Sequence, residues 1–158
     1  MNQLRKVSNL KEVNLFPGAI ELAVRSFVAD SHTKESGADP DGLYQQTIEG
    51  IAAATFLRQN DSRDLWLADE DGEVMAYTLT HVSKDVDNRL CYWITQAWVH
   101  PMIRGSKMVK SWIKLFEGDA KRKMCSHMIV PSSRGAAGYC RFLGEGWGSY
   151  VTLLKKDI

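Results

Sequence analysis

The sequence predicts a mixed α/β fold, of the α+β kind, in which one central sheet of about six strands is flanked by helices. Three observations predict it. Two segments with helical spacing of apolar residues come early, alternating apolar residues around an acidic Asp-Gly turn follow, and an aromatic, β-branched run comes next. The expected order is β-α-α-β-β-β-α-β-α-β, and 158 residues without a repeat or linker predict one domain over 1–158.

The first part of the chain is expected to contribute one short strand and two helices. Apolar residues recur at helical spacing in two stretches, with a loop of turn-forming residues between them. The expected segments are a strand around Leu4 to Val7, a helix from Ala19 to Val28, a loop from His32 to Gly42 and a helix from Leu43 to Leu57. Asp39 or Asp41 is suited to cap the second helix.

The middle of the chain is expected to form three neighbouring strands. In DLWLADEDGEVMAYTLTHV, alternating leucines precede the Asp-Gly turn and a second strand runs from Val74 to Val82, which is a hairpin pattern. The run LCYWITQAWV, from Leu90 to Val99, predicts a central strand. Its tryptophans, Trp93 and Trp98, are five residues apart, which places them on opposite faces of a regular strand.

After Arg104-Gly105 the chain returns to helical spacing. Met108, Trp112, Leu115 and Phe116 form the apolar stripe of a third helix. The last expected elements are a short strand from His127 to Val130, a small-residue helix from about Gly135 to Leu143 and a closing strand from Ser149 to Lys155.

Composition argues against several classes of function. The net charge is +1 and 44% of the residues are hydrophobic, which indicates a globular domain rather than a nucleic-acid or membrane-surface binder. Cys91, Cys125 and Cys140 lack paired spacing, so we expect neither a disulfide framework nor a metal site. Without an apolar leader or an apolar run of membrane length, the chain is expected to be soluble and cytoplasmic.

The stretch WVHPMIRGSKMVKSW predicts a strand that turns into a helix. A helix start gathers unpaired amide hydrogens and the positive end of the helix dipole, and it therefore suits a phosphate. Such loops usually depend on glycine, yet Gly105 is followed by Ser106, Lys107, Met108 and Val109. The stretch is therefore either an anion-binding turn, an altered one, or an ordinary strand–helix connection.

The spacing Val99-x-Pro101-x-x-Arg104-Gly105, together with the element order, resembles the GNAT family of acetyl-CoA-dependent N-acetyltransferases. That family's loop, V-x-P-x-x-R/Q-G-x-G-x-G/A, binds the pyrophosphate of coenzyme A through its amides. The resemblance covers the chain from about Leu65 to the end, including LADEDGEVMAY and SSRGAAGYCRFLGEGW. It implies a single GNAT-like domain that uses acetyl-CoA. The residues that it implies for coenzyme binding are Trp98, Val99, Arg104, Gly105, Ser106, Lys107, Met108, Val109 and Lys110.

Two of the family's loop glycines fall on Lys107 and Val109 in this sequence. Glycine at such positions lets the backbone approach a ligand closely, because no Cβ stands in the way. Lys107 can replace lost amide contacts with charge, and Lys110 follows one turn later. Equally, the aliphatic stem of Lys107 can fill the pocket.

The family's last helix, N-x-x-A-x-x-x-Y-x-x-x-G, commonly supplies a tyrosine that protonates the leaving thiolate. Aligning its glycine on Gly144 puts Cys140 at the tyrosine position, with Tyr139 beside it. Neighbouring helical residues point about 100° apart, so Tyr139 serves only if the helix is rotated or bulged there. Cys140 can donate a proton, since its reference pKa is about 8.5, or it is a small buried hydrophobe.

The reaction also requires a base, because a lysine amine has a reference pKa of about 10.4. The family often uses a glutamate on or near the fourth strand, but CYWITQAWVH contains no carboxylate. His100, beside the loop, and His81, at the end of its strand, are the nearest titratable candidates. Each is equally well a surface or hydrogen-bonded histidine. Acetyl transfer by direct attack can otherwise rely on positioning and an oxyanion-binding amide.

The resemblance leaves two functions open. The chain is either an N-acetyltransferase that acts on a primary amine of a small molecule or protein, or an inactive GNAT-like scaffold that binds other proteins of an assembly. Proteins that resemble this family, with similarly altered loops, are encoded by tailed bacteriophages, some as internal virion proteins, and a pseudoenzyme of that kind would reside in the virion. In a third interpretation the corner only turns the chain, and Arg104 pairs with Asp119 or faces solvent.

Overall fold

The computed structural model describes residues 3–30, 39–56, 62–130, 146 and 148. Within them one sheet has five strands in the order β1-β2-β3-β4-β5, all antiparallel except that β5 runs parallel to β4. The strands are β1 (Arg5–Val7), β2 (Arg63–Glu70), β3 (Glu73–Lys84), β4 (Leu90–Val99) and β5 (His127–Ile129). The helices are α1 (Ala19–Ala29), α3 (Pro40–Thr55) and α4 (Lys107–Arg122), with short 3-10 turns η1 (Leu10–Glu12) and η2 (Pro101–Ile103).

The predicted mixed α/β fold is confirmed, and so is the order of elements as far as β5. β4 has the predicted bounds. α3 begins at Pro40 rather than Leu43, because the Asp39 carboxylate accepts the first free amides of the helix and a proline suits its first turn. The helix predicted over 135–143 and the sixth strand predicted over 149–155 lie outside the described residues.

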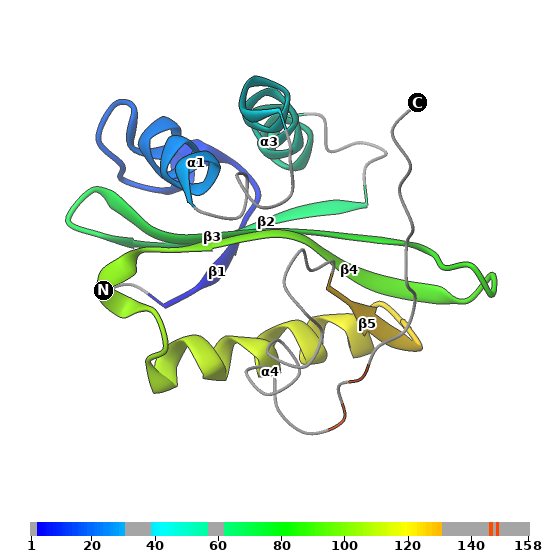
Figure 1. The fold of residues 1–158 in the computed structure, drawn as a ribbon. Helices are drawn as coiled ribbons and strands as arrows, with labels where there is room; N and C mark the ends of the chain where they lie inside the picture. Colours follow the sequence, from blue (N-terminus) through cyan, green and yellow to red (C-terminus); the bar gives the residue numbers. More distant parts are fainter. Residues whose placement is uncertain (1–2, 31–38, 57–61, 131–145, 147, 149–158) are drawn as a thin grey trace.

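The sheet carries helices on both sides (Figure 1). α1 and α3 pack on one side, here called the α1/α3 face, and α4 packs on the other, the α4 face. Each face buries its own apolar cluster, and burial of this surface drives the layers together. The α1/α3 cluster includes Val7, Ala23, Val24, Ile51, Leu65, Leu67, Tyr77, Leu79 and Trp98. The α4 cluster includes Leu4, Trp66, Ala76, Tyr92, Ile94, Val109, Trp112 and Phe116.

A β-bulge in β4 overturns one expectation from the sequence. The register between β3 and β4 shifts at Leu79/Thr80, so that Thr95 is an extra residue in β4. The extra residue reverses the alternation of side chains beyond it. Trp93 and Trp98 consequently both lie on the α1/α3 face. The prediction that they cover opposite faces is wrong, because it assumed an unbroken strand.

A buried charge network attaches α4 to the sheet around Asp119, whose exposed fraction is 3%. Lys6 Nζ lies 2.9 Å from Asp119 Oδ1, and Tyr92 Oη donates to Asp119 Oδ2 at 3.0 Å. Lys6 and Lys123 also pair with Asp64 at the start of β2. Burial by itself raises the pKa of Asp119, but hydrogen bonds from Lys6 and Tyr92 and the charge of Lys123 outweigh it and lower the pKa below its usual value.

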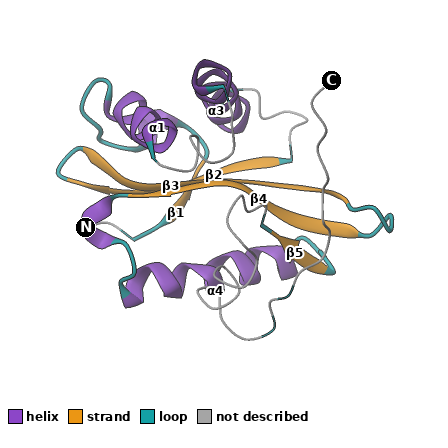
Figure 2. Cartoon of the chain, viewed as in Figure 1, coloured by secondary structure: helices purple, strands orange, loops and turns teal. Residues whose placement is uncertain are grey.

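β4 and β5 pair along only one end of β4. Cys91–Trp93 pairs with His127–Ile129, and β4 then continues to Val99 with no described strand on that side. Figure 2 shows the short β5 beside one end of the longer β4. Among the described residues, the backbone of Ile94–Val99 therefore presents a free edge, which can pair with another extended molecule.

Candidate functional site

The predicted strand–helix corner exists. β4 ends at Val99, and the amide of His100 donates to the carbonyl of Met75 on β3 at 2.8 Å. The short turn η2 follows, and Gly105 adopts a φ of +75°, a left-handed conformation that favours glycine. Ser106 then caps α4, its Oγ accepting the amide of Val109 at 3.3 Å. The corner thus delivers the start of a 16-residue helix to the end of a central strand.

Three backbone amides at this corner are open. The amide of Ser106 donates to the Ile103 carbonyl at 3.3 Å, so the turn satisfies part of its own backbone. The amides of Gly105, Lys107 and Met108 have no acceptor among the described residues. Open amides at the positive end of a helix dipole bind anions.

Arg104 is occupied within the protein. Its Nε donates to the Val99 carbonyl at 2.8 Å, and its Nη2 pairs with the Asp30 carboxylate just after α1. Arg104 was predicted to contact coenzyme A or, in the third interpretation, to pair with Asp119 or face solvent. The pairing with Asp119 is wrong, because Asp119 lies in the network of Lys6, Lys123 and Arg122.

The two residues that replace the family's loop glycines both lie inside α4. Lys107 is its first residue and is exposed, as is Lys110 one turn later. Val109 is 8% exposed and packs in the α4 cluster, so its side chain is directed to the sheet. Met108 is half-buried against the same cluster. Of these two replacements for glycine, only Lys107 places a charged, exposed side chain next to the open amides.

The predicted catalytic residues fall in different places. Tyr139 and Cys140 lie outside the described residues. His100 caps η2, its Nδ1 accepting the amide of Met102 at 3.3 Å, and its ring meets Trp98 edge-on at 5.9 Å. His81 stacks on Trp93 across β3 and β4, with ring centroids 6.0 Å apart, on the α1/α3 face.

Three buried polar side-chain atoms on the α1/α3 face lack a hydrogen-bond partner in the described part of the chain. They are Tyr77 Oη, Gln96 Oε1 and Trp98 Nε1, whereas the side chain of Trp93 hydrogen-bonds to the thiol of Cys91. The rings of Tyr77 and Trp98 stack with centroids 6.2 Å apart. The sequence did not reveal this group, since its members share a face only because of the bulge at Thr95.

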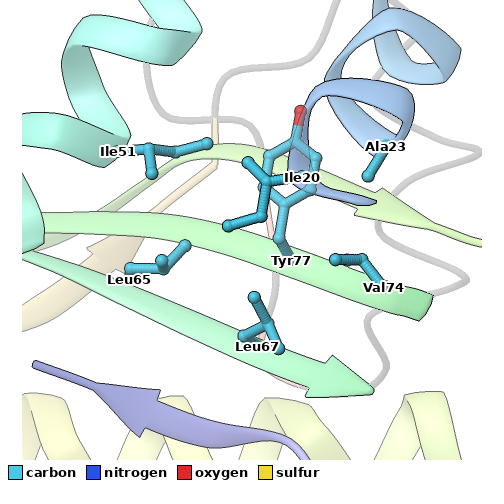
Figure 3. Close-up of a pocket in the computed structure, with 7 residues that line it drawn as sticks. All are labelled: Ile20, Ala23, Ile51, Leu65, Leu67, Val74 and Tyr77. Atoms are coloured by element: carbon cyan, nitrogen blue, oxygen red, sulfur yellow. The ribbon is translucent and has the colours of Figure 1, made fainter. Parts of the chain in front are cut away.

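The hydroxyl of Tyr77 points into a small apolar hollow between α1 and α3 (Figure 3). Burial raises the pKa of Tyr77, so the hydroxyl keeps its proton at neutral pH. The other lining residues are Ile20, Ala23, Ile51, Leu65, Leu67 and Val74. None of them carries a polar side chain that reaches the hydroxyl.

In the described ranges, no group of three or more histidine, cysteine, aspartate or glutamate side chains is arranged to hold a metal ion. The same ranges contain no helix of the length and hydropathy needed to cross a bilayer.

Solved structures show where this arrangement occurs elsewhere. No protein-family model and no curated protein matches the sequence. A transcriptional regulator from Bacillus halodurans C-125 superposes with a TM-score of 0.67 at 13% identity, covering 100% of both chains. A predicted acetyltransferase from Clostridium acetobutylicum, solved with acetyl-CoA, superposes with a TM-score of 0.62 at 17% identity, covering 99% of this chain and 96% of its own. Glucosamine-6-phosphate N-acetyltransferase from Arabidopsis thaliana superposes with a TM-score of 0.59 at 18% identity, covering 98% of this chain and 97% of its own.

These matches are mostly acetyltransferases, and they span nearly the whole of each chain. The fold of this chain is therefore the GNAT fold, as the element order and the Val99-to-Gly105 spacing indicated. Fold alone does not define a reaction, so activity has to be argued from the site.

Proposed function

We propose that this chain is an acetyl-CoA-dependent N-acetyltransferase that acts on a primary amine. The observation that carries the proposal is the set of open amides of Gly105, Lys107 and Met108, placed where the free edge of β4 ends. The GNAT fold and the similar structure solved with acetyl-CoA support it.

The described residues fit coenzyme A. The three open amides and the dipole of α4 suit its pyrophosphate, and the exposed ammonium groups of Lys107 and Lys110 lie within the first turn. The free edge of Ile94–Val99 offers backbone groups to the amides of an extended pantetheine arm. From Thr95 to Val99 the strand spans about 13 Å, at roughly 3.3 Å per residue. Acetyl-CoA supplies the acetyl thioester.

The transfer forms a C–N bond, breaks the C–S bond and returns the proton lost by the amine to sulfur. The bulge leaves the backbone of Thr95 outside the regular β3–β4 ladder, and its amide is our candidate to stabilise the developing negative charge on oxygen. Tyr139 and Cys140 are our candidates for the proton donor. His100 and His81 are our candidates for the base; Nδ1 of His100 accepts the amide of Met102, and His81 stacks on Trp93.

Ligand-induced stabilisation tests coenzyme binding. A saturable rise in unfolding temperature with acetyl-CoA and with desulfo-CoA is expected, because a ligand that binds only the native state raises stability. Lys107→Ala weakens binding if the ammonium group holds phosphate, and strengthens it if the lysine stem blocks the pocket. Lys114→Ala, an exposed lysine further along α4, is the matched control. No response at millimolar coenzyme would contradict the proposal.

Turnover with a panel of amines tests the proton donor. Tyr139→Phe and Cys140→Ala are compared with the unmodified chain, and the variant that loses activity identifies the donor. If neither substitution changes the rate, both assignments are wrong and the thiolate takes its proton from solvent.

An inactive GNAT-like scaffold is the second candidate. Two observations favour it: Lys107 stands at a position where the family has glycine, and Arg104 is held by Asp30. Saturable binding of desulfo-CoA with no turnover of any amine would favour this candidate. The chain's partners would then be other proteins of an assembly.

A further inference from the structure

Lysines of α4 form a row along the side of the helix opposite its buried side. At about 100° per residue, they fall within roughly 60° of the helix circumference, and they span about 21 Å along its axis. The opposite side carries Val109, Trp112 and Phe116, which are buried in the α4 cluster. The lysine row, as we call it, consists of the exposed residues Lys107, Lys110, Lys114 and Lys121.

The ammonium groups of the lysine row make no ion pair or hydrogen bond within the described structure. Most other basic side chains of the described residues do pair with carboxylates, namely Arg5, Lys6, Arg25, Arg89, Arg104, Arg122 and Lys123. Like charges one turn apart on a helix repel each other and lower its stability slightly. Unpaired cations are therefore concentrated on one side of α4, where an anionic partner would relieve their repulsion.

The net charge of the whole chain conceals this arrangement. It is +1 because it averages charges that lie on different parts of the fold, and on that average the composition predicts no nucleic-acid binder. Electrostatic recognition depends on local charge instead, since surface charges more than about 10 Å apart are largely screened from one another at about 0.1 M salt. The lysine row is a local concentration of positive charge of this kind.

Coenzyme A accounts for only one end of the lysine row. Lys107 and Lys110 lie in the first turn of α4, beside the open amides that suit a pyrophosphate. Lys114 lies about 10 Å from Lys107 along the helix axis, and Lys121 lies about 21 Å from it. The whole row therefore fits a longer anion whose charges repeat along its length.

Double-stranded nucleic acid has these properties. Each strand carries one phosphate charge per about 3.4 Å of duplex axis, so a row of about 21 Å lies alongside about six nucleotides of one strand. The duplex is stiff over this length, which suits a straight row better than a flexible acidic peptide does. The exposed residues of α4 include no aromatic side chain on which the bases of a single strand can stack.

We propose that the lysine row binds the phosphate backbone of double-stranded nucleic acid without sequence preference. Lysine contacts phosphate as a point charge, and such contacts carry no information about the bases. Binding of this kind releases counterions from the duplex, so its affinity depends steeply on salt concentration. The inference does not depend on the proposed acetyltransferase activity.

Fluorescence polarisation tests the inference with two labelled duplexes of about 20 base pairs and unrelated sequence. Saturable binding of both, with similar affinity, is expected at about 50 mM salt. With four phosphate contacts the slope of log K against log salt should be about −3.6, so affinity should fall roughly 150-fold between about 50 and 200 mM salt. No saturable binding at the lower salt concentration, or a slope near zero, would overturn the inference.

Lys114→Ala and Lys121→Ala test the part of the row that lies beyond the coenzyme site. Each removes one phosphate contact, so each should weaken binding to both duplexes alike and reduce the steepness of the salt slope by about 0.9. Lys84→Ala is the matched control, because that lysine is equally exposed and unpaired among the described residues but lies at the end of β3. It should leave the slope unchanged. Equal losses in all three variants would show attraction to the overall charge and would overturn the inference.

Glu117→Gln tests the same surface in the opposite direction. Glu117 is half-buried at the edge of the row, one turn from Lys114 and from Lys121, and makes no ion pair with either in the described structure. Removing its negative charge should strengthen duplex binding by about twofold to fivefold, the value of one surface charge interaction. Unchanged or weaker binding would contradict the inference.

Two further titrations identify the partner and keep the proposals apart. Poly-L-glutamate of the same total charge should bind at least about tenfold more weakly, because its charges are less dense than the one per about 1.7 Å of a duplex. Equal or tighter binding of the polypeptide would assign the row to an acidic protein and overturn the inference. If desulfo-CoA binds and the duplex does not, the lysine-row inference fails alone; if the duplex binds and desulfo-CoA does not, the acetyltransferase proposal fails alone.

Discussion

Buried tyrosine and tryptophan side chains are hydrogen-bonded on one face of the sheet and lack partners among the described residues on the other. On the α4 face, Trp66 Nε1 donates to Thr80 Oγ1 at 3.2 Å, and Tyr92 Oη bonds to the same hydroxyl at 3.1 Å. On the α1/α3 face, Tyr77 and Trp98 are buried to a similar degree, but their polar atoms have no partner in the described residues. Both faces have apolar clusters, so the difference lies in their polar atoms.

The contrast indicates that the polar groups of the α4 face contribute to stability, whereas those of the α1/α3 face do not. A satisfied buried network rigidifies the layer that it joins, as Asp119 and its lysines do for α4. Unsatisfied groups lower stability, and such groups collect where a protein binds or reacts. We therefore expect substitutions of polar groups on the α4 face to lower stability more than those of the unpartnered groups on the α1/α3 face.

Deleting Thr95 has the largest expected effect. Without the extra residue, every side chain of β4 beyond it moves to the other face, and Trp98 leaves the α1/α3 cluster. We expect a loss of more than about 4 kcal/mol of unfolding free energy, measured with urea. Thr95→Ala keeps the bulge and loses only the bond from Thr95 Oγ1 to the Leu79 carbonyl, so it should cost about 1 kcal/mol. A deletion variant as stable as the alanine variant would contradict the assigned register.

Asp119→Asn is next in size. It leaves Lys6 and Lys123 to share the Asp64 carboxylate in a largely buried site, and we expect a loss of roughly 3 kcal/mol by urea unfolding. Glu21→Gln on α1 is the control, since its pair with Arg25 is exposed and should contribute less than about 0.5 kcal/mol. Equal losses in the two variants would remove the distinction between the network and a surface ion pair.

A pair of threonine variants compares the faces directly. Thr80→Val leaves Trp66 Nε1 without its acceptor and should cost about 2 kcal/mol. Thr47→Val, on α3 against the other face, removes only a hydroxyl that donates to the Leu43 carbonyl within the helix, and it should change stability by less than about 0.5 kcal/mol. Unfolding in urea measures both. The comparison fails if Thr47→Val is the more damaging substitution.

Acid has the smallest expected effect and acts on the α4 face. The pKa of Asp119 is lower in the folded chain than in the unfolded chain, so the unfolded chain takes up the proton first as pH falls. The stabilisation from this carboxylate is therefore present above the unfolded pKa of about 3.9 and is lost as pH falls through the lower folded value. Between about pH 5 and pH 3, the unmodified chain should lose more stability than Asp119→Asn, measured by urea midpoints. Parallel pH curves would show that Asp119 is not the group responsible.

Local sequence patterns were enough to predict most of the fold. The bounds of β4, the Asp39 cap and the corner at Gly105 all depend on residues close together in the chain, whose periodicity or turn chemistry can be read directly. The same patterns predicted the GNAT fold. They also located the corner whose amides are open.

Contacts between distant residues were not predictable. Lys6 and Asp119 are 113 positions apart, and nothing in either segment indicates the other. The bulge at Thr95 leaves no distinct signal in an aromatic, β-branched run, since every residue of that run suits a strand. The expected separation of Trp93 and Trp98 was wrong for that reason, and the sequence did not reveal that both lie on the α1/α3 face.

The pairing of Arg104 with Asp30 has a consequence for how the corner responds to ionic strength. The Asp30 carboxylate, 74 positions away in the sequence, neutralises the charge of the Arg104 guanidinium beside the open amides. An anion bound there meets oriented peptide dipoles and two hydrated ammonium groups instead of an arginine fork. Added salt should therefore lower the affinity for the anion only gradually, because fixed dipoles at contact distance are screened far less than separated surface charges.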